Sequence, residues 1–161
     1  MKKLVVASAF VVTTASLFLM CDELNNKEND TIVTQSENKQ MTRTRTASGL
    51  EYEILEEGSG ASPKSGDIVT VHYTGWLNDN GDRGQEFDSS VRRNKPYSFK
   101  IDLNHVMKKG WNEGVIDMKV GEKRRLYIPS NLAYGPRSIG PVIRANSNLI
   151  FDVELIKITV I

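Results

Sequence analysis

The sequence has very few of the side chains on which most catalytic and metal sites depend. It contains one cysteine, Cys21, and two histidines, His72 and His105, in 161 residues. A single cysteine excludes an intramolecular disulfide, and no Cys-x-x-Cys or His-x-x-His pair offers a metal site. Cys/His and Ser/His/Asp arrangements therefore have little support. We interpret His72, beside Tyr73 in an expected strand, as a structural or partly exposed residue.

The sequence also has no large excess of positive or of negative charge. Lys and Arg number 21 against 20 Asp and Glu, which leaves a net charge of +1 and no general case for binding nucleic acid or an acidic membrane surface. No glycine-rich loop after a strand suggests phosphate binding. The loop 78–84 has a faint calcium-loop spacing, but its glycine is misplaced and the final Glu is missing. We expect no metal and no cofactor.

The N-terminal residues 1–21 have the layout of an export signal. Lys2 and Lys3 precede an uncharged, mostly apolar run from Leu4 to Met20, which is the order of a basic region and an apolar region in such signals. The run is borderline in length for a membrane-spanning helix, which needs about 20 apolar residues. We expect the chain to be exported, and to touch a membrane only through this end.

The way in which this segment ends leaves three alternatives. Cys21 directly follows the apolar run, as in a bacterial lipoprotein signal, where the cysteine carries the lipid. Phe18-Leu19-Met20 departs from the usual Leu-small-small pattern before that cysteine. A relaxed lipoprotein signal with Cys21 as the attachment site is the first choice, an uncleaved anchor is the second, and a free secreted product is the third. The first places the protein in a bacterial cell envelope, periplasmic or surface-exposed.

Residues 22–46 are polar and contain no aromatic side chain. Such a stretch cannot bury enough apolar surface to offset its ordering entropy. We expect a disordered linker that tethers the folded domain, residues 47–161, to the membrane, although a tail without function would have the same composition.

One helix is predicted in the folded domain, over Gly110–Met118. Trp111, Val115 and Met118 recur at the 3.6-residue period and form one apolar stripe. Gly121 stands where a helix commonly stops in a left-handed turn. The residues expected on the polar side are Asn112, Glu113, Asp117 and Lys119.

The rest of the domain has the alternating pattern of strands. The segments concerned are Leu50–Ile54, Ile68–Trp76, Tyr97–Ile101, Arg124–Ile128 and Leu149–Leu155, with a polar hairpin tip at 78–84. About five strands and one short helix predict the α+β class, with a curved antiparallel sheet wrapped over the helix.

Aromatic residues are what the domain offers in place of catalytic groups. The seven concerned are Tyr73, Phe87, Tyr97, Phe99, Trp111, Tyr134 and Phe151. Most of them could simply form the core. Two details favour a site: Asp88 directly follows Phe87 where a strand gives way to a loop, and Tyr134 lies in a Gly/Pro loop where a core residue is less expected.

Six short motifs carry a family resemblance. They are Val71–Gly75, Phe87–Ser90, Arg93–Pro96, Gly110–Gly114, Ala133–Gly135 and Phe151–Leu155. In this order and at this spacing, across roughly residues 49–158, they resemble the successive motifs of the FKBP-type peptidyl-prolyl cis-trans isomerases. The resemblance implies an FKBP-like fold, catalysis without a nucleophile, metal or cofactor, and proline-containing segments of unfolded or folding proteins as substrates.

The resemblance also implies a set of site residues. Catalytic positions would be Tyr73, Phe87, Asp88, Trp111, Tyr134 and Phe151. Substrate-binding positions would be Arg93, Tyr97, Val106, Met107, Val142 and Ile143. Trp111 would be the floor under the proline ring, while the Tyr134 hydroxyl and the backbone N–H of Met107 or its neighbour would donate to substrate carbonyls. Arg93 would orient Asp88, and Phe99 would be core.

The sequence departs from the family pattern at four places. Tyr97 stands where Phe is usual, about four extra residues lie in the 78–85 loop, and Arg144-Ala145 replaces Pro-Pro. One extra residue between Tyr97 and Trp111 affects the register at Val106 and Met107.

Two functions are compatible with these residues. The first is an active isomerase that assists the folding of exported proteins. The alternative is a weakly catalytic or non-catalytic binding module for proline-containing segments or a partner protein. The family's macrolide inhibitors are expected to compete with the substrate if Tyr97 and the Arg144 loop leave the cleft open. A monomer is the default because nothing specifies an interface.

Overall fold

The computed structural model describes residues 42–103 and 109–161. The expected export signal with Cys21, most of the expected linker, and His105, Val106 and Met107 lie outside these residues. Within the described ranges, no helix has both the length and the apolar character that crossing a membrane requires.

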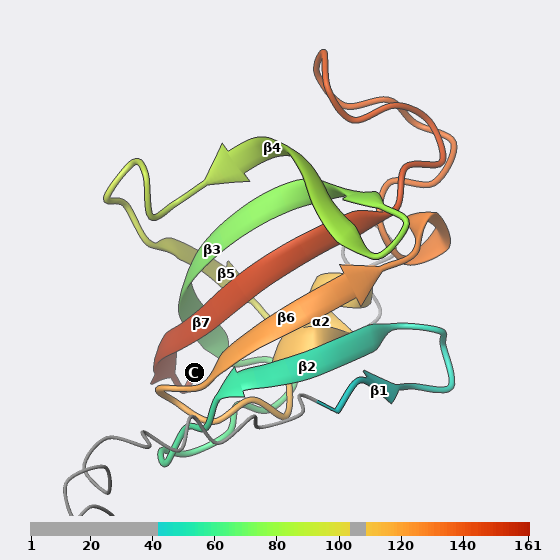
Figure 1. The fold of residues 1–161 in the computed structure, drawn as a ribbon. Helices are drawn as coiled ribbons and strands as arrows, with labels where there is room; N and C mark the ends of the chain where they lie inside the picture. The colour runs from blue at the N-terminus through green and yellow to red at the C-terminus, as the bar shows by residue number, and fades with distance from the viewer. Residues whose placement is uncertain (1–41, 104–108) are drawn as a thin grey trace, which may run out of the picture. The chain divides into compact units, whose positions relative to one another are not determined.

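Seven antiparallel strands form one curved sheet (Figure 1). They are β1 (Thr44–Arg45), β2 (Glu51–Glu56), β3 (Ile68–Asp79), β4 (Asp82–Ser89), β5 (Tyr97–Lys100), β6 (Lys123–Ile128) and β7 (Leu149–Thr159). Their order is β1-β2-β6-β7-β3-β4, and β5 pairs with the first half of β3.

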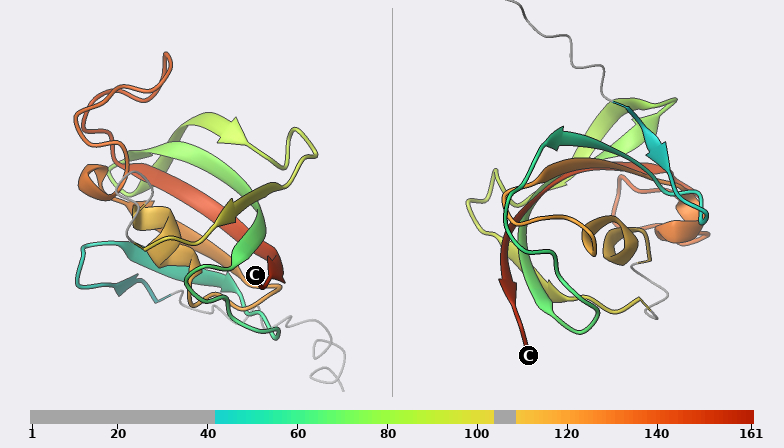
Figure 2. Two further views of the ribbon diagram at one scale, coloured as in Figure 1. Left: turned by 180° about the vertical axis from the view of Figure 1, so that it is seen from behind. Right: turned by 90° about the horizontal axis from the view of Figure 1, so that it is seen from below.

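The helix α2 (Lys109–Val115) lies inside the curve of the sheet, as Figure 2 shows from below. A short 3₁₀ helix, η2 (Ser130–Leu132), follows β6. The predicted fold class, a curved antiparallel sheet over one short helix, is confirmed among the described residues. The apolar side chains of β3, β6 and β7 and those of α2 form the core between the two layers.

The polar hairpin tip expected over 78–84 is strand instead. β3 continues to Asp79, β4 begins at Asp82, and the turn consists only of Asn80 and Gly81, with φ of 55° and 104°. Asn-Gly at the centre of a two-residue turn is a strong hairpin signal, because both residues tolerate positive φ. Polar composition misled the prediction, since this hairpin presents polar side chains to solvent.

Ordered structure also begins earlier than the expected boundary at residue 46. β1 pairs with the start of β2, inside the stretch predicted to be a disordered linker. The Arg43 guanidinium lies 3.8 Å above the Tyr127 ring, and its Nε donates to Glu53 at 3.0 Å. Arg45 pairs with Glu51 at 3.4 Å. Composition alone could not reveal this strand, because its partners are on β2 and β6.

Glu53 is buried, although it alternates with the apolar residues Tyr52 and Ile54 in the predicted strand Leu50–Ile54. It accepts a hydrogen bond from the Tyr127 hydroxyl at 3.1 Å and another from Arg43. The outer face of the sheet is therefore partly covered by this cluster.

α2 is shorter than the predicted helix, which extended to Met118. Val115 and Met118 are fully buried, as the apolar stripe predicted. Asn112 was expected on the polar side but is 1% exposed, because its amide donates to the Asp102 carbonyl at 2.7 Å and accepts from the Asp102 N–H at 3.3 Å. Gly121 has the expected positive φ of 88°, in the turn before β6 instead of at the helix end.

Two glycines bring α2 very close to β6. A Cβ on Gly110 would lie 2.5 Å from Ile128 Cγ2, and one on Gly114 would lie 2.6 Å from Leu126 Cδ1. Both contacts are shorter than carbon atoms tolerate. The Gly110–Gly114 spacing therefore gives the helix a flat face that rests on the strand, at the cost of the lower helix propensity of glycine.

A buried arginine fixes the other end of the helix. Arg124 on β6 is 3% exposed and pairs with Glu122, its Nε 2.7 Å from Glu122 Oε1. Its Nη1 donates to the Gly114 carbonyl at 3.1 Å and to Asp117 at 2.6 Å. A cation at this position satisfies a terminal carbonyl that the helix itself leaves without a partner.

We predict that Gly114→Ala lowers the free energy of unfolding by about 1–3 kcal/mol, because Leu126 is fully buried and cannot move aside. On helix propensity alone the same change would stabilise the helix by roughly 1 kcal/mol. Urea denaturation would measure the difference in the free energy of unfolding between the variant and the parent. Lys109→Ala, at an exposed position of the same helix, is the matched control. A Gly114→Ala variant as stable as the parent would contradict this packing.

Candidate active site

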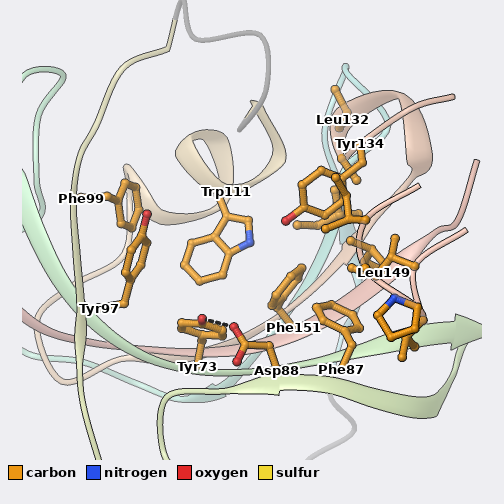
Figure 3. A pocket seen from close by; sticks show the side chains of 17 residues that line it. Tyr73, Phe87, Asp88, Tyr97, Phe99, Trp111, Leu132, Tyr134, Leu149 and Phe151 are labelled. Atoms are coloured by element: carbon orange, nitrogen blue, oxygen red, sulfur yellow. Dashed lines mark hydrogen bonds between the residues drawn. The ribbon is translucent and has the colours of Figure 1, made fainter. Parts of the chain in front are cut away.

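A cavity of about 650 Å³ opens on the inner side of the sheet, beside α2 (Figure 3). Its walls come from β3, β4, β5, α2, β6, β7 and the segment between β6 and β7. The lining residues are Tyr73, Phe87, Asp88, Tyr97, Phe99, Trp111, Ile128, Leu132, Ala133, Tyr134, Ile139, Gly140, Pro141, Val142, Ile143, Leu149 and Phe151.

Trp111 lies at the centre of a cluster of aromatic rings. Its ring centroid is 5.0 Å from that of Phe151, 5.1 Å from that of Tyr73 and 5.6 Å from that of Phe99. All three pairs are edge-to-face, with interplanar angles between 77° and 87°. Such pairs prefer this geometry because the ring edge is positive and the ring face negative. The cluster therefore fixes the orientation of the indole.

Gly75 on β3 makes room for the Phe87 and Phe151 rings in the cavity wall. A Cβ on Gly75 would lie 2.6 Å from Phe151 and 2.7 Å from Phe87. With no side chain there, the Phe87 and Phe151 rings meet edge-to-face at 5.5 Å. Any larger residue at position 75 would displace one of these rings.

Tyr73, Asp88 and Arg93 form a hydrogen-bonded group at one edge of the cavity. The Tyr73 hydroxyl donates to Asp88 Oδ2, and Arg93 Nη1 pairs with Asp88 Oδ1. Arg93 Nη2 also donates to the Tyr73 hydroxyl at 3.2 Å. The carboxylate thus has partners on both oxygens, and its charge is offset by the guanidinium.

Protonation states in this group follow from its environment. Burial raises the pKa of Tyr73, and the hydrogen bond to Asp88 raises it further. Burial alone would raise the pKa of Asp88, but the hydrogen bonds from Tyr73 and Arg93 outweigh it and hold that pKa below its ordinary value. At neutral pH the phenol is therefore neutral and the carboxylate ionised.

Ser90 anchors the chain between β4 and β5. It is fully buried, and its Oγ accepts a hydrogen bond from the Tyr73 N–H at 2.7 Å and lies 3.0 Å from His72 Nδ1. The Ser90 carbonyl accepts from the Lys95 N–H at 3.0 Å. These bonds hold Arg93 near Asp88, and they give His72 the structural contact expected of it.

Tyr134 is positioned by the turn at the end of η2. The N–H groups of Ala133 and Gly135 donate to the Ser130 carbonyl at 3.1 and 2.8 Å. In Figure 3 the Tyr134 hydroxyl points into the space beside Trp111. The loop that follows is closed at its base by the Asn146 N–H, 2.7 Å from the Gly135 carbonyl.

Most of the residues proposed from the sequence meet in this cavity. Those that line it are Tyr73, Phe87, Asp88, Tyr97, Trp111, Tyr134, Val142, Ile143 and Phe151. Arg93 does not line it but pairs with Asp88. Val106 and Met107 lie outside the described residues.

The sequence reasoning missed several apolar lining residues. Phe99 was assigned to the core, and it is buried, but it also faces the cavity. Ile128, Leu132 and Leu149 do the same. Alternation along the strands places Phe99, Ile128 and Leu149 on the inner face, but the pattern does not say where the core ends and the cavity begins. Leu132 lies in η2, where strand alternation does not apply.

Chemically, the cavity is an apolar space with a few hydroxyl groups and one neutralised carboxylate. Among the described residues, no three His, Cys, Asp or Glu side chains gather in a way that could hold a metal ion. The arrangement can hold a small apolar ring between aromatic walls and present phenolic O–H donors to nearby carbonyls. It is suited to binding and orientation without covalent chemistry.

Comparison with known proteins identifies relatives over most of the domain. A family model described as FKBP-type peptidyl-prolyl cis-trans isomerase matches residues 60–156. FK506-binding protein 1 of Saccharomyces cerevisiae is 50% identical over 110 residues, which are 68% of this chain and 92% of the yeast protein. The similarity therefore extends across nearly the whole of that relative.

Two further relatives match a larger share of this chain. FKBP-type peptidyl-prolyl cis-trans isomerase FkpA of Aeromonas hydrophila is 46% identical over 134 residues, covering 83% of this chain and 47% of that protein. The crystal structure of FkpA from Escherichia coli matches with a TM-score of 0.64 and 37% identity, over 90% of this chain and 64% of the other. This chain spans about half the length of the Aeromonas protein.

We predict that Arg93→Ala raises the pKa of the Asp88 carboxyl, measured by NMR titration of the carboxyl group. Because folding lowers this pKa, the stabilisation from Asp88 is present above its unfolded value, about 3.9, and is lost as the pH falls through the folded value. The variant should therefore be less stable than the parent at pH 7, and this difference should shrink as the pH falls through the folded pKa of Asp88. Arg92→Ala, one residue away and paired with Glu86, should leave the pKa of Asp88 unchanged. An unaltered Asp88 titration in the Arg93 variant would contradict the assignment.

Proposed function

The chain belongs to the FKBP-type peptidyl-prolyl cis-trans isomerases, and from this premise we propose that it assists the folding of exported proteins by rotating X-Pro bonds in the aromatic cavity around Trp111. The isomerase activity follows from the family. The clients, the catalytic cavity and the place of action are our proposal. The supporting observation is one cavity lined by residues from β3, β4, β5, β6, β7, α2 and η2 and from the loop that follows η2.

The reaction needs no bond to be made or broken. Rotation about an X-Pro bond faces a barrier of about 18–20 kcal/mol because the amide must lose its resonance. Uncatalysed exchange takes about 10–100 s, slow enough to limit folding. A catalyst must therefore favour the twisted amide over the planar one, which carries more charge separation.

The cavity has properties that favour the twisted amide. Its lining is mainly aromatic and aliphatic, which disfavours the charge-separated planar form. In our proposal, the proline ring rests on Trp111 between the Phe151 and Tyr73 rings. The fixed edge-to-face contacts keep this platform in place without reorganisation during the reaction.

Two polar groups are assigned to orientation. The Tyr134 hydroxyl donates to a substrate carbonyl, so that one side of the rotating bond is held while the other turns. Asp88, neutralised by Arg93, lies near the amide and keeps Tyr73 in the wall. We assign further substrate contacts to Tyr97, Val142 and Ile143, which line the same cavity.

The relatives named FK506-binding proteins suggest a second class of ligand. We propose that macrolides of the FK506 type occupy this cavity and compete with proline-containing substrates. A cavity of about 650 Å³ lies within the usual range for drug-sized ligands.

We predict that Tyr134→Phe lowers kcat/KM for a proline-containing peptide by about threefold to tenfold, the effect of losing one hydrogen bond. Trp111→Ala should cost more, because it removes the platform. A protease-coupled peptide isomerisation assay on the chain from Gln40, the start of the compact unit, would measure both.

Asp152→Asn is the control for these variants. Asp152 pairs with Arg125 at 2.7 Å and with Arg83, and it is not part of the cavity lining. The activity of the Asp152→Asn variant should therefore match that of the parent. Equal losses in all three folded variants would contradict the site map. Peptide binding by the parent without any acceleration of isomerisation would favour a binding module over a catalyst.

For the place of action, we propose export with attachment to the cell envelope through a lipid on Cys21. The supporting observations are the basic and apolar order of residues 2–20 and the cysteine that follows.

We predict that metabolic labelling with a fatty acid marks the parent protein in a bacterial host and that Cys21→Ala abolishes the label. Cys21→Ser serves as a second variant of similar size. A parent protein that is exported but never labelled would exclude the lipid anchor.

A further inference from the structure

Basic residues are concentrated on the two segments that border the cavity, 91–103 and 133–148. Their basic residues are Arg92, Arg93, Lys95, Lys100, Arg137 and Arg144, and their one carboxylate is Asp102. The whole chain carries 21 basic and 20 acidic residues. The imbalance is therefore local to the borders of the cavity.

Three of these basic groups do not add charge to the mouth of the cavity. Arg92 lies 2.6 Å from Glu86, and Arg93 pairs with Asp88, so each is offset by a carboxylate. Lys100 follows Phe99 in β5, and because successive side chains in a strand point to opposite faces, it points away from the cavity that Phe99 lines.

Arg137 has an interaction of its own. Lys95 and Arg144 are different from these four. Both are exposed, and neither makes an ion pair among the described residues. Lys95 lies two residues before Tyr97, which lines the cavity and is 37% exposed. Arg144 directly follows Ile143, which also lines it. Each cation is thus tied by a short stretch of chain to a residue at the edge of the cavity.

The two cations belong to opposite sides of the cavity. In Figure 3, Tyr97 lies on one side of Trp111, with Tyr134 and Leu149 on the other. Ile143 is part of the loop that leaves from Tyr134, where paired hydrogen bonds of 2.8 and 3.3 Å join it to Ile139. An extended peptide with its proline over Trp111 would therefore run toward Lys95 at one end and toward Arg144 at the other.

We propose that this enzyme prefers X-Pro pairs that are flanked by aspartate or glutamate, and that Lys95 and Arg144 determine this preference. The inference rests on the proposed cavity around Trp111 as the substrate site. The proline ring binds in the apolar interior, whereas the neighbouring residues remain at the basic rim. Exposed charges of this kind act mainly on encounter and binding and leave the rotation step unchanged. The preference therefore belongs in KM and kcat/KM, with similar kcat.

The test uses the full-length chain and six-residue peptides that differ only in carrying Glu, Gln or Lys next to the X-Pro pair, on either side. At low salt we expect kcat/KM to fall in the order Glu, Gln, Lys, with about threefold to tenfold between the extremes. At 1 M salt the screening length falls to about 3 Å, and the difference should largely vanish.

Charge-reversal variants identify the residues responsible. The Lys95→Glu, Arg144→Glu double variant should abolish or invert the order of the peptides. Lys157→Glu makes the same kind of change at an exposed residue about 20 Å along β7 from Phe151 and should keep the parent's order. Thermal melting of each variant would establish that it is folded.

The outcomes separate this inference from the proposed function. Equal kcat/KM for Glu and Lys peptides at low salt, or a preference unaffected by the double variant, would overturn the role of Lys95 and Arg144 while leaving the isomerase intact. If no peptide were turned over, the proposed catalysis would fail. In that case the affinities of the Glu, Gln and Lys peptides, measured by tryptophan fluorescence, would still show whether Lys95 and Arg144 favour acidic flanking residues.

Discussion

The close approach of α2 to β6 is the contact on which the site depends. Gly110 and Gly114 let the helix rest directly on Ile128 and Leu126, which sets the depth at which Trp111 enters the curve of the sheet. Arg124 fixes the far end of the helix through the Gly114 carbonyl, and Asn112 ties its first turn to Asp102. A helix held at both ends presents the indole to its neighbouring rings at one depth and one angle. If the helix stood further from the strand, the cavity would lose its floor.

Polar groups in the site are arranged so that the interior stays without net charge. Asp88 is the one ionised side chain among the described lining residues, and Arg93 and Tyr73 occupy its oxygens. The guanidinium lies outside the lining, so the apolar character of the interior is kept. Charge is instead found at the rim, on Lys95 and Arg144. In our proposal this separation assigns rotation of the amide to the interior and choice of substrate to the rim.

Sequence reasoning failed where a residue's role depends on a distant partner. β1 was taken for linker because Arg43 and Arg45 are polar, yet they pair with Glu53 and Glu51. Asn112 was placed on the solvent side because amides usually lie there, but the Asp102 backbone satisfies it in the interior. The hairpin after β3 was taken for a loop, although Asn80-Gly81 is itself a turn signal. Of these, only the hairpin could have been found from local chemistry alone.

The sequence by itself determined the fold class, the family and most of the residues around the cavity. Alternation and helical period depend on neighbours along the chain, and the family motifs are short and ordered. Only the tertiary structure decided which apolar side chains line a cavity and which fill the core, as for Phe99 and Leu149. It also decided that Glu53, Asn112 and Arg124 are buried. The physical reason is that burial of a polar group depends on whether hydrogen-bond partners from other elements reach it, and a linear pattern carries no record of those partners.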